Sequence, residues 1–312
     1  EKDVSVLDVA TGAVLHALPI DQPIMIACAP GARRLAVGTE KGGFVVDLAG
    51  AAPATRPLPE HRQLTATPDG GEPKDTIAPV PEVAFTRDGR LGASIGGDGS
   101  VRVWDAVTLK EVLLLEARRD EHAYATVLDF SPSGETILVG DSTGELIEWR
   151  VSDGKKLRAA RLHRSAIVAL RAAPDGSRIA TASSDRSVLL IRQGDLAVER
   201  TIEEHAALLS SIDWSPDGQL LVTGSEDLSA FVWEASSGGL VGSVQPGGDG
   251  AFGAVFAGER IVAATRGGRI MSFPATRETR SPAAIKQILD CRLPFRLGGG
   301  GIERIAPAEG CR

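Results

Sequence analysis

Four side chains in residues 203–238 are of types that can do acid–base chemistry or form a buried hydrogen-bond chain: His205, Thr223, Asp227 and Trp233. An indole N–H can only donate. A hydroxyl can accept from it and donate onward to an imidazole, whose other nitrogen donates to a carboxylate. Buried polar groups are almost always satisfied in this way, so a lone His and Asp are explained more simply by such a chain than by catalysis. We predict that the four residues form a structural relay and that the protein has no catalytic residue.

The elements that position these side chains are three short strands of alternating apolar residues, at 209–214, 220–224 and 230–234. Turns separate them at Asp217-Gly218 and at Glu226-Asp227. This is the pattern of a β-meander, in which the strand that carries the Trp lies beside the strand that carries the hydroxyl.

The meander and its four polar residues resemble the WD-repeat family of β-propellers, in a bacterial-type, partly degenerate form. In that family each blade holds a buried relay of a His, a Ser or Thr, an Asp and a Trp. A period of about 40–45 residues is typical of these repeats. Here a glycine recurs in the first turn of each unit, with spacings of 58, 45, 42, 42 and 40 between Gly31, Gly89, Gly134, Gly176, Gly218 and Gly258.

The resemblance implies an all-β fold, which we predict to be a seven-bladed β-propeller of four-stranded antiparallel blades, in a single domain, 1–312. The chain opens with two strands of a unit within residues 1–18, and residues 282–306 look like a degenerate unit with only its first two strands. We expect these two segments to complete the last blade together, because a closed ring removes exposed strand edges.

Residues 49–81 interrupt the period and contain seven prolines, so they cannot supply a continuous hydrogen-bond ladder. We predict an insertion loop with one short outer strand. The loop joins the first unit to the second on the face where partners of this family dock. We therefore expect it to contribute to partner contact, with a neutral spacer as the alternative.

The other units match the relay only in part. Counting back ten and six residues from each Trp finds the expected hydroxyl and carboxylate in some units only, and we expect the complete set in the fifth unit alone. The partial sets are Ser94, Asp98 and Trp104 without a His in the second unit, His122 and Trp149 in the third, and His163, Thr181 and Asp185 in the fourth, where Ile191 stands in the Trp position.

Composition excludes several functions. With 34 basic and 41 acidic side chains the net charge is −7, which is no electrostatic footprint for nucleic acid or for an anionic membrane. No apolar run approaches the roughly 18 residues needed to cross a bilayer. The chain begins at Glu1. A mature secreted form and a piece of a longer protein both fit that start.

Motifs for a cofactor or a metal are not found: the sequence has no glycine-rich phosphate loop, no closely spaced Cys pair and no nucleophile elbow. We therefore predict no cofactor and no metal site. Cys28 and Cys291 occupy an inner-strand position and are expected to be small buried hydrophobes. A Cys291–Cys311 bridge would form only in an oxidising compartment. A reduced, cytoplasmic location is favoured over a periplasmic or secreted one.

The resemblance implies a function in binding proteins, as a non-catalytic interaction scaffold or sensor domain in signalling or assembly. We expect a monomeric domain, on its own or within a larger chain or complex, that uses no nucleic acid and no membrane. The alternative is a propeller that binds a small ligand or carries an enzymatic activity in its central channel. The partner-binding face is predicted from the turns and connections on one side of the ring: Lys41, Asp98, Arg118, Arg164, Arg186, Glu226 and Arg266.

Overall fold

In the computed structural model the chain forms two compact units, Glu1–Pro274 and Ala275–Arg312. The prediction of a single domain over 1–312 stays a prediction. The described residues are 3–8, 11, 13–31, 33–50, 52–65, 74–116, 123–203, 205–227, 229–244, 251–265, 269–275, 295–298 and 301–304.

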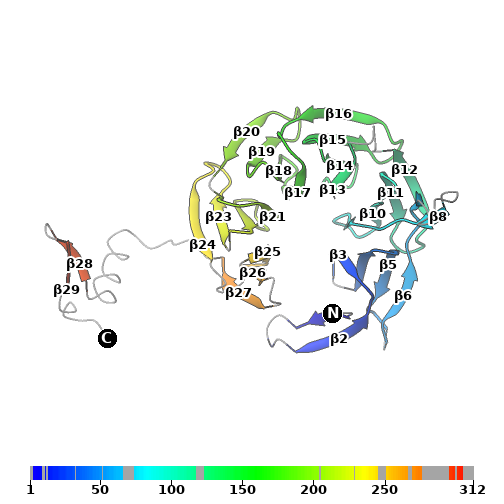
Figure 1. Cartoon of the computed structure of the whole chain (residues 1–312), viewed down its shortest axis with the longest axis horizontal. Coiled ribbons are helices and arrows are strands. Elements are labelled where there is room, and N and C mark those ends of the chain that lie inside the picture. Colours follow the sequence, from blue (N-terminus) through cyan, green and yellow to red (C-terminus); the bar gives the residue numbers. More distant parts are fainter. Residues whose placement is uncertain are drawn as a thin grey trace. The chain divides into compact units, whose positions relative to one another are not determined.

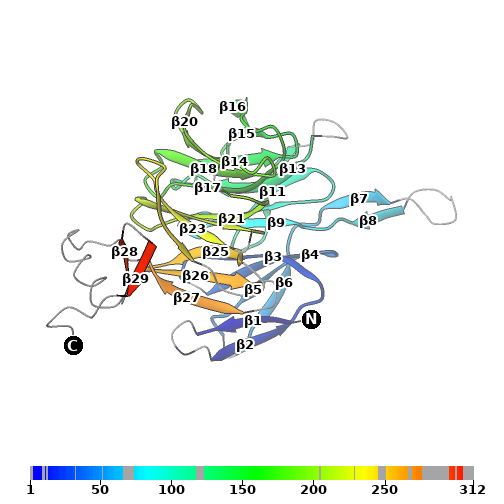
Figure 2. The same ribbon diagram turned by 60° about the vertical axis from the view of Figure 1, so that its left-hand side comes forward.

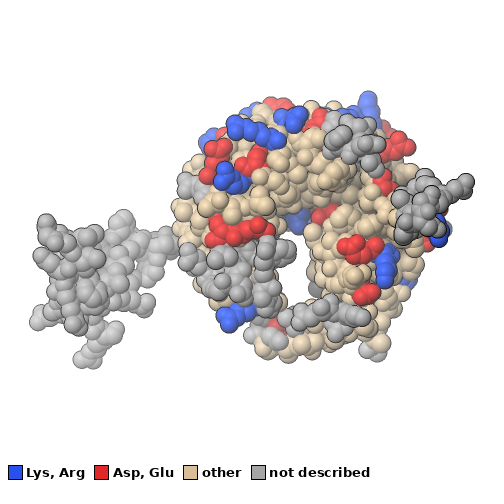
Figure 3. Space-filling model, in the orientation of Figure 1, with Lys and Arg blue, Asp and Glu red and all other residues tan. Residues whose placement is uncertain are grey.

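The first unit is a ring of antiparallel sheets, as Figure 1 shows, and the space-filling view in Figure 3 shows an opening at its centre, the central channel. Each sheet is a simple up-and-down meander, because consecutive strands pair with one another. The first three blades contain β3 (Pro23–Cys28), β4 (Arg34–Thr39), β5 (Gly42–Asp47) and β6 (Ala54–Pro57); β9 (Glu82–Phe85), β10 (Leu91–Ile95), β11 (Ser100–Asp105) and β12 (Glu111–Glu116); and β13 (Ala125–Phe130), β14 (Thr136–Asp141), β15 (Glu145–Arg150) and β16 (Lys156–Arg161).

Two further blades have four strands, and the sixth has three among the described residues. The inner strand of each blade contacts the inner strand of the next, from β3 round to the sixth blade. The strands are β17 (Ile167–Ala172), β18 (Arg178–Ser183), β19 (Val188–Arg192) and β20 (Val198–Ile202); β21 (Leu209–Trp214), β22 (Leu220–Ser225), β23 (Ala230–Glu234) and β24 (Leu240–Val244); and β25 (Ala251–Ala257), β26 (Arg260–Thr265) and β27 (Ile270–Pro274).

Position within a blade determines which side chains are apolar. In the first five blades, the second strands are covered on both faces by their neighbours, so they are almost wholly buried: all six residues of β22 are buried. The outer strands have one face in solvent, and β12 is mostly exposed. A strand buried on both faces reads as a continuous apolar run, whereas a half-buried strand alternates.

A bulge recurs at the same place in the inner strands. The register shifts between Ala125 and Val127 in β13, between Ile167 and Ala169 in β17, and between Leu209 and Ser211 in β21. An extra residue on one strand bends that strand and increases the local twist. The repeated bulge therefore gives successive blades a common twist, which a radial arrangement of sheets requires.

The repeating glycine has a conformational role in the turn after the inner strand. Gly134, Gly176 and Gly218 have φ of 73°, 73° and 68°, in the left-handed region that other residues adopt at a cost. The N–H of Gly218 donates to the carbonyl of Ser215 over 2.8 Å, which closes the turn. The period read from the glycines thus reports a fixed turn geometry.

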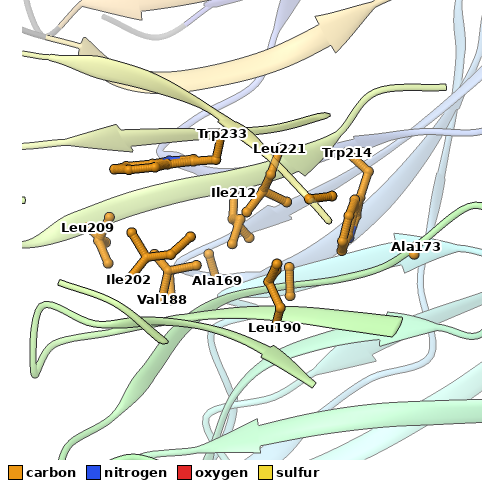
Figure 4. Packing of buried hydrophobic residues seen from close by; sticks show 13 residues of the cluster. Ala169, Ala173, Val188, Leu190, Ile202, Leu209, Ile212, Trp214, Leu221 and Trp233 are labelled. Atoms are coloured by element: carbon orange, nitrogen blue, oxygen red, sulfur yellow. The ribbon is translucent and has the colours of Figure 1, made fainter. Parts of the chain in front are cut away.

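The cores lie between neighbouring blades. One cluster joins the fourth and fifth blades through Leu190, Ile212, Trp214 and Trp233, which are all buried. Figure 4 shows these side chains directed from strands of both sheets into the space between them. Each blade therefore covers the apolar face of the next, and the fold is stabilised by burial between repeats.

The expected seven blades are wrong: the described residues form six. The N-terminal strands β1 (Asp3–Leu7) and β2 (Val14–Pro19) pair only with each other there, and so do β28 (Phe295–Gly298) and β29 (Gly301–Arg304) in the second unit. Closure of a blade by residues 1–18 with 282–306 is not confirmed. The glycine spacing predicts a turn near Gly299. It does not predict that the strands on either side of this position, β28 and β29, pair with each other.

The β1–β2 hairpin packs on the first blade. Val4 and Leu18 are buried in one cluster with Leu35, Val37 and Val46 of that blade. The hairpin therefore stands in the ring beside the first blade, as Figure 1 shows.

The insertion 49–81 is more ordered than the expected loop. It contains the expected outer strand β6, but also a hairpin of β7 (Arg62–Thr65) and β8 (Lys74–Ile77). Prolines predict a loop, yet here Pro57 ends an outer strand, and Pro79 follows the hairpin. The hairpin, called the arm below, projects from the ring in Figure 2.

In the part of the chain that the structure describes, we find no helix long and apolar enough to cross a membrane.

Candidate functional site

The relay of the fifth blade is a continuous hydrogen-bond chain. The indole N–H of Trp233 donates to Thr223 Oγ1 over 2.9 Å, and Thr223 Oγ1 lies 2.7 Å from His205 Nε2. His205 Nδ1 lies 2.9 Å from Asp227 Oδ2. His205, Thr223 and Trp233 are all buried. Buried groups that bond to one another in series are already partnered and enclosed, so this arrangement holds the blade together.

Asp227 connects the relay to the backbone. Its carboxylate accepts from the N–H of Ala206 and from the N–H and hydroxyl of Ser229. Burial raises the pKa of Asp227, but the hydrogen bonds from Ser229 and His205 together lower it by more. The pKa therefore lies below its usual value. The ionised carboxylate therefore links the connection before β21 to the turn between β22 and β23.

The fourth blade repeats the relay without the indole. His163 Nε2 lies 2.8 Å from Thr181 Oγ1, and His163 Nδ1 lies 3.2 Å from Asp185 Oδ2. Ile191, fully buried, occupies the place of the Trp. Burial lowers the pKa of His163 and outweighs the attraction of Asp185. The imidazole is accordingly a neutral hydrogen-bonding link.

The second blade has a His that counting along the sequence missed. His61 is fully buried, with Nε2 2.9 Å from Ser94 Oγ and Nδ1 3.0 Å from Asp98 Oδ1. The expectation that this blade lacks its His is wrong because the arm separates His61 from β9. The His is expected a fixed number of residues before the inner strand, and this rule fails where an insertion lies between the two. A His just before the insertion is the sequence signal that could have identified His61.

Asp98, expected on the partner face, thus belongs to this relay. Its side chain is 13% exposed and also accepts from the N–H and hydroxyl of Ser100. Burial raises its pKa, but hydrogen bonds from His61 and Ser100 hold it at about 2. A carboxylate occupied in this way has little to offer a partner.

Trp104 of the same blade is fully buried but does not join the relay. Its indole N–H has no hydrogen-bond partner among the described residues. The ring covers Gly92, where an added Cβ would lie 2.1 Å from it, and it packs against Ala36 and Val45 of the first blade. Here the Trp contributes apolar contact between blades.

The third blade has a similar unpartnered indole. Trp149 Nε1 is buried without a hydrogen-bond partner in the described part of the chain, and Val139 lies where the hydroxyl would be needed. His122, expected in this blade, is outside the described residues.

Four of the residues expected on the partner face are exposed on turns and connections on one side of the ring. Lys41 forms a solvent-exposed ion pair with Asp21, 3.5 Å apart. Arg164, Arg186 and Glu226 are also exposed. Arg118 and Arg266 lie outside the described residues. Figure 3 shows charges of both signs interspersed over the face in view, without a single-sign patch.

The arm is attached to the same side of the ring by backbone hydrogen bonds at its base. The N–H of Ala78 donates to the carbonyl of His61 over 2.8 Å, and the N–H of Val80 donates to the carbonyl of Thr39 over 3.0 Å. The N–H of Gly97 donates to the carbonyl of Pro79 over 2.8 Å. Both neighbouring blades therefore hold the base of the arm.

The channel wall carries a charged cluster that the sequence reading did not find. Asp129, Arg171 and Asp213 occupy the same position in three successive inner strands, and buried Glu82 interacts with Asp129 and Arg171. Burial raises the pKa of Glu82 to about 8, because the attraction of Arg171 does not offset it. Burial also raises the pKa of Asp213. Only the ring brings these residues together, since about 40 residues separate neighbours along the chain.

Both aspartates of the cluster bind the backbone of the next blade. Asp129 Oδ2 accepts from the N–H of Ala172 over 2.9 Å, and Asp213 Oδ2 accepts from the N–H of Phe256 over 2.7 Å. These contacts join consecutive inner strands. Their first role is to hold the ring together.

Neither metal binding nor a disulfide is indicated by the residues that the structure covers. They include no group of three or more His, Cys, Asp or Glu able to hold a metal ion. Cys28 is exposed, contrary to expectation. The equivalent residue in the third blade, Phe130, is buried because it packs against the second blade. On the corresponding side of the first blade, the described residues form only the two-stranded β1–β2 hairpin, so Cys28 is less well covered. Cys291 and Cys311 lie outside the described residues.

Comparison with known proteins agrees with this geometry. Residues 75–105, 154–191 and 197–234 match the family model described as WD domain, G-beta repeat. Among solved structures, the chain is similar to the β-propeller domain of Cps50 (Swd1) from Myceliophteria thermophila. The TM-score is 0.70 at 15% identity, over 88% of this chain and 90% of that chain. No curated protein sequence matches it.

The ring of antiparallel meanders defines the class of the protein as a β-propeller. The three matched stretches, two of which contain a histidine relay, show that the chain carries WD repeats. The resemblance predicted from the sequence is confirmed.

Proposed function

We propose that the protein is a non-catalytic scaffold that binds a protein partner on the side of the ring that carries the arm. WD-repeat propellers are typically interaction scaffolds, and loops held by a rigid framework are where proteins place their binding residues. The observation that carries the proposal is the arm itself. A hairpin whose base is fixed to two blades, and whose strands pair only with each other among the described residues, presents strand edges to another chain.

The charges on this side of the ring favour a protein over a polyanion. Lys41, Arg164, Arg186 and Glu226 are exposed and of mixed sign. On the arm itself, Arg62 pairs with Asp75 over 2.9 Å and with Glu60 over 2.8 Å. Nucleic-acid binding instead needs a basic stripe along one face. Self-compensating pairs of this kind suit the rim of a protein interface.

A small ligand or an activity in the channel is the second candidate, and the charged cluster is the observation in its favour. Against it, Asp129 and Asp213 are already hydrogen-bonded to backbone N–H groups. A catalytic carboxylate needs a free lone pair directed at its substrate.

Replacing residues 63–76 with a short Gly-Ser turn should reduce partner capture and leave stability nearly unchanged. The replacement starts after His61, because His61 belongs to a buried relay. Changes in loop length cost about 1 kcal/mol or less, so we expect the melting temperature to stay within a few degrees. The measurement is affinity capture with quantitative mass spectrometry, beside a thermal melt.

Asp153→Ala is the matched control, since Asp153 lies in the β15–β16 turn on the opposite side of the ring. It should capture the same partners as the wild type. Undiminished capture by the protein without the arm would show that the arm is not the docking element. A large fall in its melting temperature would show that the arm is packed structure.

A further inference from the structure

A cavity of about 470 Å³ opens between the β1–β2 hairpin and the first blade. Most of its wall is apolar, and Lys41 and Asp21 stand at its rim as an exposed ion pair. Its lining includes Ala17, Pro19, Ile20, Thr39 and Phe44. Cavities with apolar walls and a few polar groups at the mouth are the usual form of a binding pocket.

The strand register shows what the first blade lacks at this place. Phe44 pairs with Val37 in the first blade, as Phe231 pairs with Thr223 in the fifth. In the fifth blade, the ring of Phe231 stacks on the imidazole of His205, with centroids 4.5 Å apart and an angle of 19° between the planes. Phe44 is therefore the counterpart of Phe231, whose ring is stacked on the His205 imidazole in the fifth blade.

Among the residues that the structure describes, no His lines the cavity beside Phe44. The connection into the first blade has Pro19 and Ile20 where the fifth blade has its His, and Val37 stands in place of the relay hydroxyl. Ile20 is buried against Val37, so it takes over the apolar contact. Phe44 is left half-buried on the wall of the cavity.

We propose that this cavity binds the planar ring of an aromatic side chain presented by a partner polypeptide. Offset stacking on Phe44 would reproduce the contact that His205 makes with Phe231. Aromatic pairs of this kind are more stable than the buried apolar area alone accounts for. The polar groups of the wall already have partners, so they do not call for a charged ligand. Thr39 Oγ1 donates to the carbonyl of Gly42 and accepts from the N–H of Lys41, and Lys41 is paired with Asp21. The inference rests on the proposed function and names the residue type that anchors the partner.

The test uses N-acetyl-5-fluorotryptophanamide as the probe, followed by ¹⁹F NMR line broadening with the whole chain. N-acetylleucinamide serves as the aliphatic competitor. Ala17→Trp should block the cavity from an exposed position on β2 and weaken probe binding by at least about tenfold. Ala159→Trp, at an exposed position on the outer strand β16, is the matched control and should bind as the wild type does.

Phe44→Leu keeps an apolar wall but removes the stacking ring. We expect it to lose the preference for the tryptophan probe over the leucine competitor. Equal broadening with wild type and Ala17→Trp, or equal competition by N-acetylleucinamide in the wild type, would overturn the proposal. None of the described residues of the arm lines the cavity, so the protein without the arm should keep probe binding even if its partner capture falls. Failure of one proposal is thus distinguishable from failure of the other.

Discussion

Trp233→Ala should destabilise the protein by about 3–5 kcal/mol, the range for removing a fully buried aromatic ring. Trp233 is 1% exposed and packs in the cluster between the fourth and fifth blades. Its loss also leaves Thr223 Oγ1 without the indole donor, inside a core from which water is excluded. The lost hydrogen bond accounts for about 0.5–1.5 kcal/mol of that total. Urea unfolding followed by circular dichroism measures the change.

Trp149 provides the comparison within the same molecule. Its indole has no hydrogen-bond partner among the described residues, and its side chain is only partly buried. Trp149→Phe should therefore cost clearly less than Trp233→Phe, because both changes retain a ring and only the second breaks a hydrogen bond. Indistinguishable urea midpoints for the two Phe variants would refute the polar contribution of the relay. A wild-type midpoint for Trp233→Ala would refute the packing contribution as well.

The sequence is most informative where a repeat is local. The relay of the fifth blade could be predicted because its His, Thr, Asp and Trp lie within one meander, whose turns are set by glycines at positive φ. The same offsets miss His61, because residues 62–77 form a hairpin between that His and its strand. An offset rule fails wherever an insertion lies between two residues that the fold brings together.

The number of blades could not be read from the turns. Six first-turn glycines and half a unit at each end suggest seven, but a turn does not specify which strands pair across the ends of the chain. Pairing between strands some 280 residues apart depends on side-chain complementarity, which turn spacing does not report. The described residues pair β1 with β2 and β28 with β29 instead.

The channel cluster was missed for a related reason. Asp129, Arg171 and Asp213 each look like an ordinary polar residue in an alternating strand. Their equivalent positions become visible only when the bulges of the inner strands are included in the alignment. Sequence periodicity predicts which face a residue lies on, but not which residues from different repeats meet at the axis.

Glu82 should make the protein less stable as the pH rises from about 4.5 to about 8. Its side chain is 5% exposed, and burial raises its pKa from 4.5 to about 8, with Asp129 adding to the shift and Arg171 opposing it. In this window the unfolded chain has lost the proton and the folded chain still holds it. Stability is therefore full below pH 4.5 and falls until the folded pKa is passed. A shift of this size corresponds to a loss on the order of 5 kcal/mol.

Glu82→Gln keeps the shape of the side chain and removes its titration. The variant should match the wild type near pH 4 and exceed it in free energy of unfolding at pH 8.5, as measured by urea titrations across that range. His163, whose pKa burial lowers, contributes a slope of the opposite sign near pH 6.5, but it is common to both proteins and cancels in their difference. Glu259→Gln, at an exposed turn, should leave the pH profile unchanged. Parallel profiles for wild type and Glu82→Gln would mean that Glu82 ionises as freely in the folded protein as in the unfolded chain, and that the channel wall there is open to water.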